Sequence, residues 1–149
     1  MFSFFSRSVG IAALSVVVLV LAACGESSEE KATKQACAAT SEIKAQVKKL
    51  GTLPISSSFV TEVKTSAEAI DKSVGEVKSA APNLPAASKE EFDVATRTFQ
   101  LELASLIATT VKSSTSSEAA LKSAEPEIKA SLSKLEADYK KAFEGLKCS

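Results

Sequence analysis

The reactive chemistry of this 149-residue chain rests first on three thiols, those of Cys24, Cys37 and Cys148. A thiol can carry a lipid, join a disulfide or bind a metal, and an odd number leaves one thiol unpaired within the chain. The chain has no His, and its only Met is the initiator, so haem, copper and zinc sites lack most of their usual ligands. We therefore predict no metal site and no cofactor.

Enzymatic side chains are equally few. Without His, Ser with Lys is the only pairing of a nucleophile with a base, and every such neighbour falls on a polar helix face or in a helix cap. The acidic pair Glu29 and Glu30 lies in a polar N-terminal segment, and the pair Glu90 and Glu91 lies where a helix should begin. We predict no catalytic residue, and hence a protein that is not an enzyme.

The N-terminal segment has the composition of a targeting signal. Arg7 is its only charge, an apolar run follows from residue 10 to 23, and the run ends in Leu21-Ala22-Ala23-Cys24. This arrangement resembles the lipobox of bacterial lipoprotein precursors. The resemblance implies that residues 1–23 are a signal peptide that is removed, and that the Cys24 thiol carries acyl chains such as palmitate. The lipidated protein would then be anchored at the extracytoplasmic face of the cell membrane.

Two other interpretations of this segment remain open, an uncleaved membrane anchor and an ordinary secretory signal. Lipidation of Cys24 would leave Cys37 and Cys148, which in an oxidising compartment are expected to form one disulfide. A pair of free thiols and a two-thiolate metal site are the alternatives for these two residues. Without residues 1–23 the chain carries 17 basic and 18 acidic residues, and a net charge of −1 argues against a nucleic-acid partner.

Helical periodicity runs through the rest of the chain. Residues 25–31 are polar and acidic, so residues 24–33 are expected to form the lipidated Cys and a flexible tether, and residues 34–149 a helical bundle domain. Apolar residues recur every three or four positions in four segments, near 34–50, 58–81, 88–112 and 115–146. Ser88 with Glu91, and Thr115 with Glu118, have the spacing of capping boxes. Pro126 interrupts the last segment, and we predict a kinked helix rather than two helices there.

Four such helices joined by short loops predict an all-α fold, an up-down-up-down antiparallel four-helix bundle that is a monomeric domain. In that topology the start of the first helix and the end of the fourth share one pole, which brings Cys37 close to Cys148. The tether attaches at the same pole, so this pole should face the membrane.

The placement of the Cys residues and the helical spacing from Ala36 to Cys148 also resemble small bacterial lipoproteins with a helical, disulfide-closed domain of uncharacterised function. No functional residue can be transferred from that resemblance. Two functions are therefore considered. The first is a non-enzymatic interaction with an envelope protein or polymer, and the alternative is a small carrier of an apolar ligand or lipid.

Overall fold

The computed structural model describes residues 27–84, 89–115, 117–146 and 148. These residues form the helices α1 (Ser28–Thr52), α2 (Ser57–Ala80), α3 (Lys89–Ser114), α4 (Glu118–Ser123) and α5 (Glu125–Phe143), with a short 3₁₀ helix, η1 (Ala81–Asn83), after α2. No strand occurs among them, so the prediction of an all-α fold is confirmed. None of these helices combines the length and the apolarity that crossing a bilayer requires.

The helix α1 begins at Ser28, whereas the sequence analysis placed its start at Lys34. Ser27 accepts a hydrogen bond from the Glu30 amide at 3.2 Å, and the Glu30 carboxylate accepts one from the Ser27 amide at 3.0 Å. This capping box satisfies two amides that would otherwise lack partners. Ala32 is also buried in the core. The prediction of a flexible tether through residue 33 is therefore wrong for residues 28–33, which are helical.

Pro126 separates two helices, so the predicted single kinked helix is also wrong. Ser117 caps α4 by accepting a hydrogen bond from the Ala120 amide, and α4 ends at Ser123. Pro126 then lies in the first turn of α5. An amide in the first turn of a helix has no partner within that helix, so a proline there forfeits no hydrogen bond, and this arrangement avoids that penalty of a mid-helix proline. The predicted capping box of Ser88 with Glu91 lies outside the described side chains.

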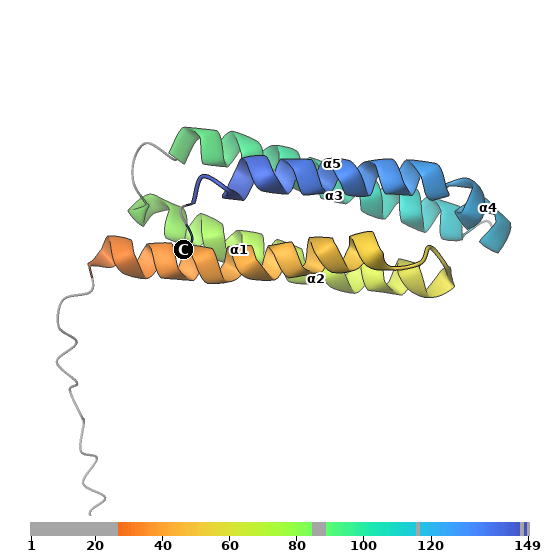
Figure 1. Cartoon of the computed structure of the whole chain (residues 1–149), viewed down its shortest axis with the longest axis horizontal. Helices are drawn as coiled ribbons and strands as arrows, with labels where there is room; N and C mark the ends of the chain where they lie inside the picture. The colour runs from red at the N-terminus through yellow and green to blue at the C-terminus, as the bar shows by residue number, and fades with distance from the viewer. Residues whose placement is uncertain (1–26, 85–88, 116, 147, 149) are drawn as a thin grey trace, which may run out of the picture.

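The long helices form two pairs (Figure 1). α1 packs along α2, and α3 packs along α5, while the contacts of α2 with α3 and of α1 with α5 are less extensive. A continuous hydrophobic core lies between them. Near one end of this core Phe143 makes edge-on contacts with Phe92 and Phe99, at ring-centroid distances of 6.0 and 5.6 Å. The core thus joins the two helix pairs, and the less extensive α1–α5 contact leaves space at the surface.

Candidate functional site

Two of the three cysteines lie among the described residues, and these two are bonded to each other. Cys24 lies outside the described residues. Cys37, in α1, and Cys148, after α5, form a disulfide with their Cα atoms 5.4 Å apart, across a sequence separation of 111 residues. The predicted pairing is therefore confirmed. Cys37 is partly buried, whereas Cys148 is exposed. The disulfide fastens the C-terminal end of the chain to the N-terminal half of α1 (Figure 1).

A second link joins α1 to α5 near the disulfide. The hydroxyl of Tyr139 donates a hydrogen bond of 3.3 Å to the main-chain carbonyl of Thr40, and the Tyr139 side chain is buried. Burial raises the pKa of Tyr139 above its ordinary value, and the negative charge of Glu144 raises that pKa further. Tyr139 therefore stays protonated well into alkaline solution and remains a hydrogen-bond donor.

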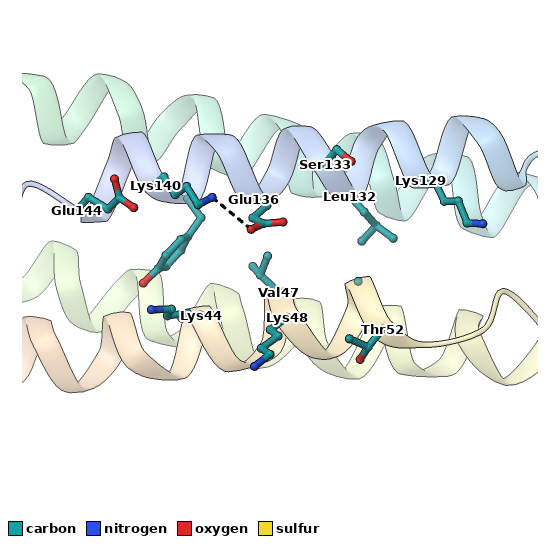
Figure 2. A pocket seen from close by; sticks show the side chains of 12 residues that line it. Lys44, Val47, Lys48, Thr52, Lys129, Leu132, Ser133, Glu136, Lys140 and Glu144 are labelled. Atoms are coloured by element: carbon teal, nitrogen blue, oxygen red, sulfur yellow. Dashed lines mark ion pairs between the residues drawn. The ribbon is translucent and has the colours of Figure 1, made fainter.

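Beyond this link, α1 and α5 border a groove with a volume of about 580 Å³ (Figure 2). That volume lies in the range of small-molecule and peptide-anchor pockets. The groove is formed by residues of these two helices and by Glu144, which directly follows α5. Its lining comprises Lys44, Val47, Lys48, Gly51, Thr52, Lys129, Leu132, Ser133, Glu136, Tyr139, Lys140 and Glu144.

The floor of the groove is apolar and its rims are charged. Val47, Leu132 and Tyr139 are only 5–9% exposed and contribute the floor. Figure 2 shows Val47 and Leu132 pointing into the space between α1 and α5. Lysines line both rims, with their aliphatic stems available to an apolar group and their ammonium groups in solvent.

The lysines of the two rims differ in their pairing. On α5, Lys129 forms an ion pair with Glu125 at 2.6 Å, and Lys140 forms one with Glu136 at 3.4 Å. On α1, Lys44 and Lys48 form no ion pair with any residue that the structure describes. The α1 rim therefore presents two unneutralised positive charges one helical turn apart.

Gly51 lines the groove at the C-terminal end of α1, away from the disulfide. A Cβ atom added at Gly51 would meet no heavy atom within 4 Å, so the space beside that residue is open. Within the described part of the chain, no group of three or more His, Cys, Asp or Glu side chains could hold a metal ion. The groove therefore offers chemistry suited to binding, through ammonium groups, hydroxyls and a narrow apolar floor.

The helical pattern of the sequence does not predict this groove. Its residues lie on two helices that are about 80 positions apart in the chain, and each helix taken alone has an ordinary polar face. The predicted bundle topology and the pairing of Cys37 with Cys148 were the available signals that these two helices are neighbours. Comparisons of the chain with protein-family models, with curated proteins and with solved structures found no match.

Proposed function

We propose that this chain is a lipid-anchored protein of the bacterial cell envelope that binds an envelope protein or polymer and catalyses no reaction. The observation that supports this proposal is the groove between α1 and α5, which has an apolar floor and lysines on both rims. The lipobox-like segment that ends at Cys24 supports the location. The groove and the anchor together define a binding protein held at a membrane surface.

The proposed arrangement of the helices is an up-down-up-down four-helix bundle with α4 as an additional short helix. Contacts link α1 to α2, α2 to α3, α3 to α5 and α5 to α1, which is the cycle of neighbours that this bundle requires. Since α1 begins at Ser28, a lipid on Cys24 would attach at the pole where α1 begins. The part of α1 that borders the groove would then lie roughly 24–36 Å farther along the helix axis. A partner would meet the groove in the extracytoplasmic space rather than within the bilayer.

The anchor is tested by replacing Cys24. In cells given a labelled fatty acid, Cys24→Ser should abolish label incorporation and leave the precursor unprocessed, because the serine hydroxyl cannot form the thioether. Cys37→Ser is the matched control and should keep the label. Incorporation of label into the Cys24→Ser protein would refute the lipid anchor.

The groove is tested by photocrosslinking of the full chain in intact cells. A photoreactive amino acid at Ser133, an exposed position in the groove, should give adducts that the same amino acid at the exposed Thr65 of α2 does not give. A protein partner gives a discrete band, whereas a polymer gives a ladder or a smear. Equal adduct yields at the two positions, or none at Ser133, would contradict binding at the groove.

A second candidate function is the transport of an apolar ligand or lipid, and the apolar floor of the groove favours it. Mass spectrometry of the gently purified protein would then detect a bound lipid. Ser133→Trp should displace that lipid by filling the groove, and Thr65→Trp should not. Equal lipid content in both variants would exclude the groove as a carrier site.

A further inference from the structure

The residues that line the α1–α5 groove recur at the spacing of a helix-packing face. On α1 they stand at positions 44, 47, 48, 51 and 52, on α5 at 129, 132, 133, 136, 139 and 140, and Glu144 directly follows α5. Steps of three and four residues on two adjacent helices create the ridges and the groove into which a further helix packs. The lining from Lys129 in α5 to Glu144 just after it spans 15 residue steps, or roughly 22 Å, which matches about four turns of a helix lying alongside.

Lysines are distributed along this face, and the excess positive charge lies on its α1 rim, because the α5 lysines are paired with acidic residues. Lys44 and Lys48 lie one turn apart on the α1 rim, and Lys129 and Lys140 lie about three turns apart on the α5 rim. Among the lining residues only Glu136 and Glu144 are acidic, so the groove carries a net positive charge. Lys44 and Lys48 also form no ion pair with the described residues, and an acidic partner could pair with them without breaking an existing contact.

We propose that the groove binds an acidic amphipathic helix of a partner protein, aligned with α1 and α5. The apolar face of that helix would contact Val47 and Leu132, and acidic side chains on its flanks would pair with Lys44 and Lys48. This is the helix-in-groove mode of recognition, with charge complementarity at the flanking positions. The inference rests on the proposed function, because it specifies the partner of the same groove.

Other anionic ligands match fewer features of the groove. A fatty acid carries one charge at one end, whereas the groove presents two lysines without an ion pair among the described residues, Lys44 and Lys48, one turn apart on the α1 rim. A sugar-phosphate polymer carries distributed charge but has no apolar side chains for the floor formed by Val47 and Leu132. An acidic amphipathic helix satisfies the floor and the rims together.

Binding of a synthetic peptide tests this inference. The probe is a fluorescein-labelled peptide of about 15 residues with Leu at heptad a and d positions and Glu at the flanking positions. The processed full chain is held in nanodiscs of phosphatidylcholine, and empty nanodiscs provide the blank for fluorescence anisotropy. A peptide with Lys in place of Glu, and another with Ser in place of Leu, should each bind at least about tenfold more weakly.

The matched protein variants reverse two charges inside and outside the groove. Lys44→Glu with Lys48→Glu should weaken binding of the acidic peptide by about tenfold or more, whereas Lys64→Glu with Lys72→Glu on α2 should change it less than about twofold. All four lysines are exposed, and circular dichroism of both variants verifies that the fold is retained. Equal affinity of the two variants, or no binding of the acidic peptide, would overturn the inference.

Two further probes separate failure of the inference from failure of the proposed function. Palmitate and the acidic polysaccharide polygalacturonate are tested against the same variants. If either binds in a way that depends on Lys44 and Lys48 while the peptide does not, the helical partner is wrong and the binding groove stands. If no probe binds and Ser133 gives no crosslink in cells, both proposals are overturned.

Discussion

The Tyr139 hydroxyl and the Thr40 carbonyl lie 3.3 Å apart, although 99 residues separate them in the chain. Their hydrogen bond crosses from α5 to α1 at the end of the groove nearest the disulfide. Tyr139 also forms part of the groove floor, and its ring contacts the Phe143 ring at a centroid distance of 5.3 Å. One side chain thus connects the aromatic core, the helix pairing and the candidate site.

Removing this hydrogen bond should lower stability moderately. Tyr139→Phe keeps the ring and deletes only the hydroxyl, so the free energy of unfolding should fall by about 0.5–1.5 kcal/mol. Urea denaturation followed by circular dichroism measures the change. A variant as stable as the parent protein would show that the bond contributes no net stability.

Stability should also decline in alkaline solution because of Tyr139. Its pKa is raised in the folded state by burial and by Glu144, so the unfolded state loses this proton at a lower pH than the folded state does. The contribution of protonated Tyr139 to the free energy of unfolding is complete below about pH 10 and is lost as the pH rises from there towards the folded-state pKa. Tyr139 is the only tyrosine, so tyrosinate absorbance follows it alone. Glu144→Gln should lower its pKa, and an unchanged titration would contradict the effect of Glu144.

The disulfide should be the largest single contributor to stability among the features described above. Cys37 and Cys148 close a loop of 111 residues, and cross-linking a loop of that size is worth about 4–5 kcal/mol through lost chain entropy. Cys148 is exposed, so a reductant can reach the bond in the folded protein. Thermal unfolding with and without reductant should show a clear fall in Tm. The double variant Cys37→Ala with Cys148→Ala should not respond to the reductant.

Replacing Gly75 with alanine should stabilise the protein. Gly75 is an exposed position within α2, and an added Cβ atom would meet nothing within 4 Å. Glycine inside a helix is less favourable than alanine by about 0.5–1 kcal/mol, so Gly75→Ala should raise the free energy of unfolding by that amount. Ala137→Gly, at an exposed position of α5, should lower it by a similar amount. A loss of stability in Gly75→Ala would mean that the site is not open.

Thr110 should gain stability when its hydroxyl is removed. Its side chain is fully buried in α3, and the hydroxyl has no hydrogen-bond partner among the described residues. Thr110→Val replaces that hydroxyl with a methyl group of similar size and should stabilise the fold by about 1 kcal/mol. Thr40 is the matched control, because its buried hydroxyl donates to the Ala36 carbonyl at 2.7 Å. Thr40→Val should give no comparable gain, and equal changes in the two variants would contradict this explanation.

The buried face of α2 and the pairing of the cysteines could be predicted from the sequence. Val63, Ile70 and Val77 repeat at steps of seven and are all fully buried. A helix with one apolar stripe removes that stripe from water by packing it against a core. The disulfide could be predicted because the proposed lipid on Cys24 left only Cys37 and Cys148 to pair. The predicted order of the helices also placed these two residues at the same pole.

Three other features, the start of α1, the break before Pro126 and the groove, depend on local competition between structures or on tertiary contact, so the sequence pattern does not predict them. The start of α1 depends on the capping box that Ser27 forms with Glu30. Both residues lie in a polar stretch whose composition alone predicts a tether. The break before Pro126 depends on the competition between one kinked helix and two helices, of which Ser117 caps the first and Pro126 lies in the first turn of the second. The groove depends on how closely α1 approaches α5, which the pattern of neither helix determines.

The disulfide between Cys37 and Cys148 also turns most of the domain into a covalent ring. A protease that cuts once between these residues, for example in the loop between α1 and α2, opens the ring but releases no fragment. The nicked protein would migrate as one species on a non-reducing gel and as two after reduction. A cut in a single loop therefore leaves every helix between Cys37 and Cys148 covalently attached to the N-terminal part of α1.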